Sequence, residues 1–281
     1  MKLLVHNGRL ISESTFSGLN RGLYYGDGFF ETMRLINGRV HLFNVHMKRF
    51  SKAMMHLGLN INDTISPLNL NVSLEKLAAA NEIDNGRVRL TVYRTAGGAF
   101  VPESDEVEWV AELISVEQNG FEINRKGLLI DVYKKERKWQ HSALPFKSLN
   151  AAFYIQAGRF ARDKKVDEVL VLNENDEIIE SLYSNIFYFL NNKLCTPPIE
   201  GGGLPGVMRA FVIHVLQKNG VEVLERILQE EDLYNVEELF LTNAVKGIQW
   251  VGGFGAKRFY SRHIREYSNY LQKTISLKAA V

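Results

Sequence analysis

The sequence has a single cysteine, Cys195, and this scarcity excludes two kinds of site. One cysteine cannot form an internal disulfide framework, nor a metal site built from several cysteines. The histidines show neither an H-E-x-x-H pattern nor a spacing with cysteine that indicates zinc, and no G-x-S-x-G motif indicates a serine hydrolase. The sequence therefore predicts a protein of the reducing cytoplasm without a metal centre.

The chain also lacks an excess of charge and long apolar segments. Its 34 basic and 32 acidic residues give a net charge of +2, and no dense block of lysine and arginine indicates nucleic-acid binding. The apolar start "MKLLV" is broken by "HNG", and no later segment approaches the roughly 18 apolar residues of a membrane helix. We expect neither a signal peptide nor a membrane span, and a small molecule as the partner.

The 281 residues are enough for a large core and for two domains, and the 46% hydrophobic content is typical of a globular protein. Asn-Gly pairs at 7–8 and 37–38 each separate two short apolar segments, which predicts two β-hairpins. Helices are expected from Asn44 ("VHMKRFSKAMMHLG") and at "SLEKLAAANEI", and strands at "RVRLTVYR" and "EWVAELISV". Residues 1–117 are therefore predicted to form an α+β domain.

The second predicted domain, residues 118–281, is larger and rich in strands. A strand is expected at "GLLIDVYK", a helix from about Ser148 to Asp163, and two hairpins at "EVLVLNENDEIIES" and "NIFYFLNNKLCTP". A helix follows "GGGLPG", and an amphipathic helix ends the chain. The fold class is therefore α+β, with strands inside and helices outside in this domain.

Lys147 is a candidate nucleophile because of its position in "SALPFKSLNAAFY". It is expected to open a helix whose buried face carries Leu149, Ala152, Phe153, Ala157 and Phe160. A partly desolvated ammonium has a lowered pKa, so more neutral amine is available to attack a carbonyl. The alternative is an ordinary solvated charge near a helix end.

The segment "GGGLPG", residues 201–206, matches the G-x-G-x-x-G pattern of dinucleotide-binding folds. A nicotinamide-dependent oxidoreductase is therefore one alternative. Pro205 stiffens this turn, however, and "CTPPIE" interrupts the strand that should lead directly into it. A narrower inference is that backbone N–H groups at Gly206 and Val207, at a helix N-terminus, provide a seat for phosphate.

Glu180 in "IIESLYSNIF" is expected at a strand end before a polar turn. A fixed carboxylate there could hold the ring nitrogen of a cofactor in its cationic form, and the alternative is an exposed turn carboxylate. Arg34, Arg49 and Arg89 are candidate anion clamps, although each alone is more typical of a protein surface. Core packing is the alternative explanation for the aromatic residues of "RGLYYGDGFFETMRL".

Six segments in order resemble the class IV, or fold-type IV, pyridoxal-phosphate enzymes, which include branched-chain aminotransferases, D-amino-acid aminotransferases and aminodeoxychorismate lyase. These segments are "RGLYYGDGFFETMRL", "HMKRF", "KSLN", "ESLYSNIF", "GGGLPGVMR" and "LTNA". The resemblance covers nearly the whole chain. It implies pyridoxal 5′-phosphate as the cofactor, a small N-terminal domain with a larger cofactor-binding domain, and a homodimer.

The resemblance also implies roles for individual residues. Lys147 would form a Schiff base with the cofactor aldehyde and later move the α-proton, and Glu180 would pair with the pyridine nitrogen. The phosphate would be bound by Arg49, Gly206, Val207, Thr242 and Asn243. The substrate would contact Tyr25, Phe30 and Arg89.

The substrate is less well defined by these motifs. "KSLN" resembles the D-amino-acid and lyase branches and "LTNA" the lyase branch, whereas Glu31 stands where some lyases have threonine. Ser181 replaces the family's usual glycine after the cofactor-binding glutamate. We expect an amino acid aminotransferase, with aminodeoxychorismate lyase of folate synthesis, which releases pyruvate and 4-aminobenzoate, as the alternative. A binding module that keeps the fold without catalysis is a third possibility, disfavoured by the presence of Lys147 and Glu180.

Overall fold

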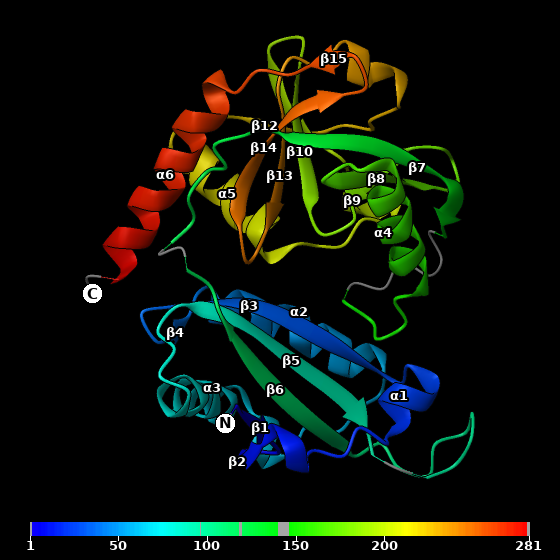
Figure 1. The fold of residues 1–281 in the computed structure, drawn as a ribbon, viewed down its shortest axis with the longest axis vertical. Helices are drawn as coiled ribbons and strands as arrows, with labels where there is room; N and C mark the ends of the chain where they lie inside the picture. The colour runs from blue at the N-terminus through cyan, green and yellow to red at the C-terminus, as the bar shows by residue number, and fades with distance from the viewer. Residues whose placement is uncertain (1, 96, 118–119, 140–145, 280–281) are drawn as a thin grey trace. The chain divides into compact units, whose positions relative to one another are not determined.

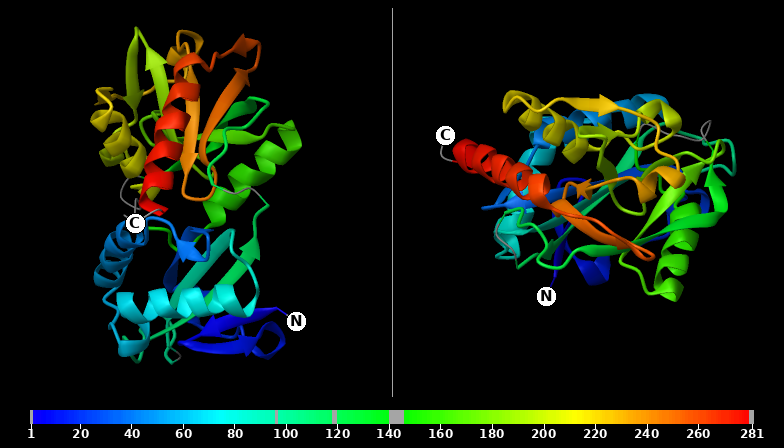
Figure 2. Two further views of the ribbon diagram at one scale, coloured as in Figure 1. Left: turned by 90° about the vertical axis from the view of Figure 1, so that its left-hand side faces the viewer. Right: turned by 90° about the horizontal axis from the view of Figure 1, so that it is seen from above.

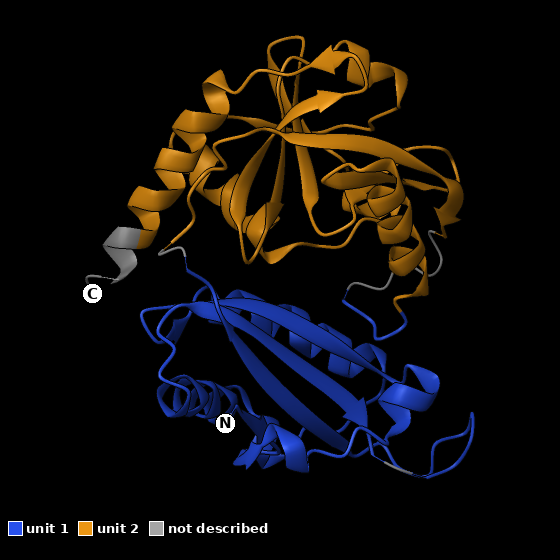
Figure 3. Ribbon diagram, viewed as in Figure 1, with its two compact units in different colours: residues 1–119, 145–150 blue, residues 120–144, 151–281 orange. Residues whose placement is uncertain are grey.

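The computed structural model describes residues 2–95, 97–117, 120–139 and 146–279. The chain divides into two compact units, coloured separately in Figure 3. Unit 1 contains Met1–Asn119 and Pro145–Asn150, and unit 2 contains Gly120–Leu144 and Ala151–Val281. None of the helices in the described ranges is both long enough and apolar enough to span a membrane.

Unit 1 is a six-stranded antiparallel sheet in the order β2-β1-β6-β5-β3-β4, with helices packed against it (Figure 1). The strands are β1 (Leu3–His6), β2 (Arg9–Ser12), β3 (Gly28–Ile36), β4 (Arg39–Val40), β5 (Gly86–Arg94) and β6 (Val107–Ser115). The helices are α1 (Arg21–Tyr25), α2 (Phe43–His56) and α3 (Pro67–Ala80). Alternate residues of β3 are fully buried, and Phe29 of that strand packs edge-to-face on Phe50 of α2, with ring centroids 5.2 Å apart.

Both hairpins predicted in this unit are confirmed. β1 pairs with β2 across the turn at Asn7, and β3 pairs with β4 across the turn at Asn37. Both asparagines have positive φ angles, 48° and 50°, and each is followed by a glycine, which such turns favour. Helix α2 begins at Phe43, just before the predicted cap Asn44, because Leu42 takes the cap position.

Unit 2 contains a nine-stranded sheet whose main path runs β12-β11-β10-β13-β14-β7-β8-β9, with β15 on β14. The strands are β7 (Leu128–Lys138), β8 (Glu168–Asn173), β9 (Ile178–Ser181), β10 (Asn185–Leu190), β11 (Lys193–Thr196), β12 (Val223–Glu225), β13 (Leu239–Asn243), β14 (Gly247–Phe254) and β15 (Lys257–Arg258). The helices are α4 (Ala152–Lys164), α5 (Val207–Lys218) and α6 (Arg262–Ala279). The two predicted hairpins are confirmed as β8-β9 and β10-β11. Helices α5 and α6 pack side by side (Figures 1 and 2).

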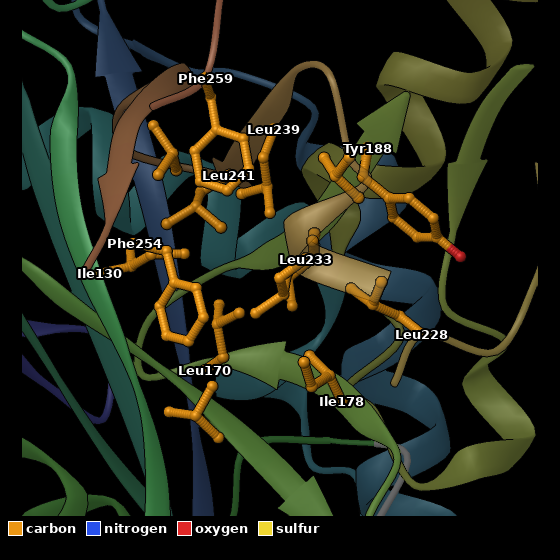
Figure 4. Packing of buried hydrophobic residues seen from close by; sticks show 14 of the residues in the cluster. Ile130, Leu170, Ile178, Tyr188, Leu228, Leu233, Leu239, Leu241, Phe254 and Phe259 are labelled. Carbon is orange, nitrogen blue, oxygen red and sulfur yellow. The ribbon is translucent and has the colours of Figure 1, made fainter. Parts of the chain in front are cut away.

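A cluster of buried apolar side chains, many of them from β7, β8, β10, β13 and β14, forms one hydrophobic core of unit 2 (Figure 4). Ile130, Leu170, Leu239 and Phe254 belong to it, together with Tyr188, whose hydroxyl donates to the carbonyl of Arg226 at 2.9 Å. Full burial of one such side chain contributes about 1.5–3 kcal/mol. The cluster therefore holds the central strands in fixed positions. Strands β9, β10 and β13 carry the candidate residues described below.

The predicted helix from Ser148 to Asp163 begins later than expected. Residues around Lys147 are extended and pair with β3: the N–H of Phe30 donates to the carbonyl of Lys147 at 2.8 Å, and Ser148 bridges to Phe29. Helix α4 consequently begins at Ala152, which is exposed rather than buried. The prediction that Lys147 opens a helix was wrong, since pairing with a distant strand determines the local backbone.

Candidate active site

In unit 1, Lys147 and Arg89 contact the same aromatic ring. The Lys147 Nζ lies 5.5 Å from the centroid of the Phe30 ring, and the guanidinium carbon of Arg89 lies 3.8 Å from it. Arg89 stands opposite Thr32 in the pairing of β5 with β3, and burial lowers its pKa. The ring therefore brings a primary amine and a guanidinium into one neighbourhood, where both could contact a single small molecule.

Two further predicted residues of unit 1 lie in different surroundings. Tyr25 ends α1 with 44% of its surface exposed, and its ring lies below the guanidinium of Arg21 and beside Phe100. Arg34, a candidate anion clamp, is buried in β3 with 1% exposed. Core packing therefore explains the position of Phe29 but not that of Tyr25. It does not explain the neighbouring Tyr24 either, which is 62% exposed.

Arg49 lies beneath β3 in a buried cluster with Glu31 and His46. Its Nε donates to Glu31 Oε1 at 2.7 Å and its Nη2 to Glu31 Oε2 at 2.6 Å, while the Nδ1 of His46 lies 2.8 Å from Oε2. Burial alone would raise the pKa of Glu31, but the adjacent Arg49 charge and the hydrogen bonds lower it to about 2. The carboxylate is therefore ionised, and it fixes the guanidinium in one orientation.

The charge of Glu31 also determines the tautomer of His46. An ionised carboxylate only accepts hydrogen bonds, so His46 must carry its hydrogen on Nδ1. Burial lowers the pKa of His46, which keeps the ring neutral, and its Nε2 has no hydrogen-bond partner within the described ranges. Sequence reasoning missed this cluster, although Glu31 alternates with the apolar Phe29 and Met33.

In unit 2, Glu180 lies on β9 opposite Val171 of β8 and is 4% exposed. Three donors surround its carboxylate: Lys138 Nζ at 2.7 Å and the Tyr154 hydroxyl at 2.6 Å on Oε1, and the Leu204 N–H at 2.8 Å on Oε2. Burial raises the pKa of Glu180, but the Lys138 charge and these hydrogen bonds outweigh burial and lower it. Glu180 is therefore a buried, ionised carboxylate and not an exposed turn residue.

In unit 2, four of the five residues predicted to bind phosphate lie at or near the N-terminus of α5, whereas the fifth, Arg49, belongs to unit 1. Gly206 caps this helix and Val207 is its first residue. A Cβ on Gly206 would collide with the Asn185 side chain, and Asn185 pairs with Thr242 across β10 and β13. The Thr242 hydroxyl is buried without a hydrogen-bond partner among the described residues. An anionic oxygen fits here, because free helix N–H groups and an unpaired hydroxyl are both donors.

Asn243, next to Thr242, closes the loop beside this seat. Its side-chain amide donates to the Ser184 hydroxyl at 3.0 Å, and its Oδ1 accepts from the backbone N–H groups of Val245 and Lys246. Asn243 therefore links the turn after Glu180's strand to the end of β13. It is in place to orient the seat.

The glycine-rich segment lacks the context of a dinucleotide-binding motif. β11 ends at Thr196, and a 3-10 helix, Ile199–Gly201, lies between that strand and the rest of the segment. Instead, the segment supplies the Leu204 N–H to Glu180 and the glycine cap of α5. Its structure favours the narrower inference of a phosphate seat.

Ser181, which replaces a glycine usual in the resembling family, fits its turn. Its N–H donates to the carbonyl of Ser184 at 2.7 Å, and its hydroxyl donates to the same oxygen at 3.3 Å. Its φ angle is not positive, so the backbone does not require glycine there. The replacement therefore leaves the turn after Glu180 intact.

Glu168, at the start of β8, provides a test of this region by pH. Burial raises its pKa to about 7, although the positive charge of Lys246 partly offsets burial. Because its pKa is raised in the folded state, Glu168 stabilises the fold at pH values below its ordinary pKa of 4.5. This stabilisation is lost as the pH rises through about 7. We expect the unfolding free energy of the wild type to fall by about 3 kcal/mol relative to Glu168→Gln between pH 4.5 and pH 8.

Urea unfolding of the cofactor-free protein across this pH range measures the difference. The exposed Glu222, replaced by Gln, serves as the control and is expected to follow the wild type at each pH. Parallel pH profiles for the wild type and Glu168→Gln would show that Glu168 is not held protonated in the folded state.

The comparison with protein families finds one match over most of the chain. The family described as amino-transferase class IV matches residues 28–252. A D-alanine aminotransferase of Listeria monocytogenes is 30% identical over 249 residues, which cover 86% of this chain and 84% of the relative. The aminodeoxychorismate lyase of Bacillus subtilis is 27% identical over 246 residues, which cover 85% and 82% of the two chains.

Solved structures show the same fold. The branched-chain aminotransferase of Thermoproteus uzoniensis, solved with norvaline, superposes with a TM-score of 0.87 at 22% identity and covers 96% of this chain and 93% of that one. The branched-chain aminotransferase of Thermobaculum terrenum, in its pyridoxal-phosphate form, gives a TM-score of 0.83 at 20% identity and covers 98% and 94%. The chain therefore has the fold-type IV architecture, which confirms the predicted fold class.

Proposed function

Because the chain belongs to the amino-transferase class IV family, we propose that it is a pyridoxal 5′-phosphate-dependent enzyme that transfers the amino group of an amino acid to a 2-keto acid. The observation that carries the proposal is Glu180, a buried carboxylate kept ionised by three donors. Burying a carboxylate is costly, and a cationic ring nitrogen is the group that such a carboxylate stabilises in these enzymes.

In this proposal each residue has a defined task. Bound pyridoxal phosphate supplies an acceptor for the electron pair that the substrate's α-carbon gains when it loses its proton. Lys147 would hold the cofactor through its side-chain amine, and this amine would also serve as the general base for the α-proton. Glu180 would accept a hydrogen bond from the protonated ring nitrogen. The phosphate would be held by Arg49, Gly206, Val207, Thr242 and Asn243.

Arg89 and Phe30 are proposed to orient the substrate. A guanidinium binds a carboxylate through paired hydrogen bonds, and Arg89 lies over the ring that Lys147 also contacts. A substrate carboxylate on Arg89 would leave the α-carbon near the Lys147 amine. Tyr25, which is exposed at the end of α1, is proposed as a further wall of the substrate site.

Aminodeoxychorismate lyase is the second candidate function, favoured by the similarity to the Bacillus subtilis lyase. Glu31 does not argue against it, because this carboxylate is fully engaged with Arg49 and His46 under the sheet. Incubation with aminodeoxychorismate, without any keto acid, distinguishes the two functions. Release of pyruvate under these conditions indicates the lyase, whereas a transaminase turns over only when an amino acceptor is added.

Replacing Gly206 by alanine tests the phosphate seat. The new Cβ collides with the Asn185 side chain, whose amide donates to the carbonyl of Leu204 at 2.8 Å, so the loop before α5 must shift. We expect the affinity for pyridoxal phosphate to fall at least about tenfold, as the loss of one or two hydrogen bonds to a charged group predicts. Fluorescence titration of the cofactor-free protein measures this affinity.

Gly158→Ala is the matched control for this variant. A Cβ at this position, on helix α4 of the same unit, would lie 3.6 Å from Leu182, an ordinary contact distance. We expect this variant to bind the cofactor like the wild type. Equal affinities for Gly206→Ala and Gly158→Ala would remove the N-terminus of α5 from the proposed site.

The proposal also includes a cytoplasmic setting and a homodimer. The single buried cysteine supports the first, since the chain carries no disulfide framework suited to an oxidising compartment. The family resemblance supports the second. Sedimentation of the purified protein at several concentrations measures its oligomeric state.

A further inference from the structure

The hydrogen-bond donors around Glu180 are distributed unequally over its two carboxylate oxygens. An ionised carboxylate offers about four acceptor positions, two on each oxygen. Oε1 accepts from both Lys138 and Tyr154, whereas Oε2 accepts only the N–H of Leu204 among the described residues. One position on Oε2 therefore remains for a further donor.

Lys138 is the charged member of this donor set. Its side chain is 12% exposed, and its Nζ lies 5.5 Å from the ring centroid of Tyr154, so the ammonium contacts Tyr154 as well as Glu180. The Tyr154 hydroxyl stays neutral, because burial raises its pKa well above the ordinary value, and the Leu204 amide carries no charge. Without Lys138, a fully buried carboxylate would retain two neutral donors, too few to offset its desolvation.

We infer that Lys138 is a positioning residue, which anchors Oε1 of Glu180 through an ion pair and thereby reserves the open position on Oε2 for the N–H of the cofactor's pyridine ring. The inference rests on the proposed function, because it assumes that pyridoxal phosphate binds. Lys138 acts through Glu180 and needs no contact with the substrate. Its removal should therefore change the protonation of the ring nitrogen before it changes any other property of the bound cofactor.

The chain provides a matched control on the same strand. Lys134 of β7 also forms an ion pair at 2.7 Å, with Glu230, but its side chain is 59% exposed. Lys134→Met therefore removes the same ammonium and one ion pair without touching Glu180. Lys138→Arg is the conservative variant, since a guanidinium can restore both the charge and the donor.

The first test uses the cofactor-free protein. Urea unfolding of Lys138→Met, Glu180→Gln and the double variant measures the coupling between the two side chains. We expect the double variant to be more stable than the two single effects predict, by at least about tenfold in the folding equilibrium constant, because it leaves no buried charge unpaired. Lys134→Met combined with Glu180→Gln should show no coupling.

The second test observes the ring nitrogen directly. Pyridoxal phosphate labelled with ¹⁵N in the ring is bound to each variant, and the nitrogen chemical shift reports whether that atom carries a proton. We expect the protonated shift in the wild type, Lys134→Met and Lys138→Arg, and a displacement toward the unprotonated shift in Lys138→Met. A purely structural role for Lys138 would leave this shift unchanged.

The outcomes separate the inference from the proposed function. If Lys138→Met binds the cofactor with a fully protonated ring nitrogen, or if the cycle shows no coupling, the inference is wrong and the proposed function stands. If the wild type binds no pyridoxal phosphate, the proposed function is wrong, and the assignment of the open position on Oε2 is wrong with it.

Discussion

Replacing Lys147 by alanine is expected to abolish turnover, with kcat lowered by at least about 10⁴-fold, while leaving the fold intact. The proposed reaction uses this amine twice, to hold the cofactor and to move the α-proton, and loss of general base catalysis alone costs up to about 10⁴-fold. The fold should survive because the backbone carbonyl of Lys147, and not its side chain, accepts from Phe30. Steady-state assays and thermal unfolding measure the two effects.

Two variants sharpen this prediction. Lys147→Arg keeps the positive charge, but a guanidinium does not lose its proton in proteins, so this variant should be equally inactive. Lys48→Ala removes an exposed lysine of α2 in the same unit and should turn over like the wild type. Activity close to wild type in Lys147→Ala would contradict the assignment of the catalytic amine.

Replacing Glu180 by alanine is expected to retain part of the bound cofactor but to reduce turnover by at least about 100-fold. The loss of one preorganised electrostatic contact in an active site typically costs 10²–10³-fold, and here the lost carboxylate holds the ring nitrogen cationic. Cofactor content is measured by absorbance after release from the protein. Turnover is measured at saturating pyridoxal phosphate, so that weaker binding does not mimic a slower reaction.

Glu180→Gln separates charge from shape. It keeps the volume and one acceptor oxygen for Tyr154 or Lys138 but removes the negative charge, so its turnover should resemble that of Glu180→Ala. Glu222→Gln, an exposed substitution in the same unit, should leave turnover unchanged. A rate in Glu180→Gln equal to that of the wild type would remove this carboxylate from the reaction.

The local parts of the fold could be predicted from the sequence, and the non-local parts could not. The predictions of turns at Asn-Gly 7–8 and 37–38 were correct, because the turn residues themselves favour positive φ angles. The predicted start of α4 was wrong, because residues 147–149 pair with β3, which lies more than a hundred residues earlier in the chain. A pairing over that distance leaves no local pattern in the sequence.

The same distinction applies to the candidate site. Lys147 and Glu180 were predicted because they stand in motifs whose order resembles a known family. Lys138 was missed because "KKERKW" has the composition of a solvated charged strand, and its partner is 42 residues away. Tyr154 left a usable signal, since it lies at helical spacing from the buried Ala157 and Ala161.

The visible absorption spectrum of the purified protein, before and after borohydride reduction, tests the proposed function most directly. The proposal predicts a yellow protein whose visible band disappears on reduction, with the cofactor mass found on the peptide that contains Lys147. A protein that stays colourless after pyridoxal phosphate is added, or a reduced label on any other lysine, would contradict it.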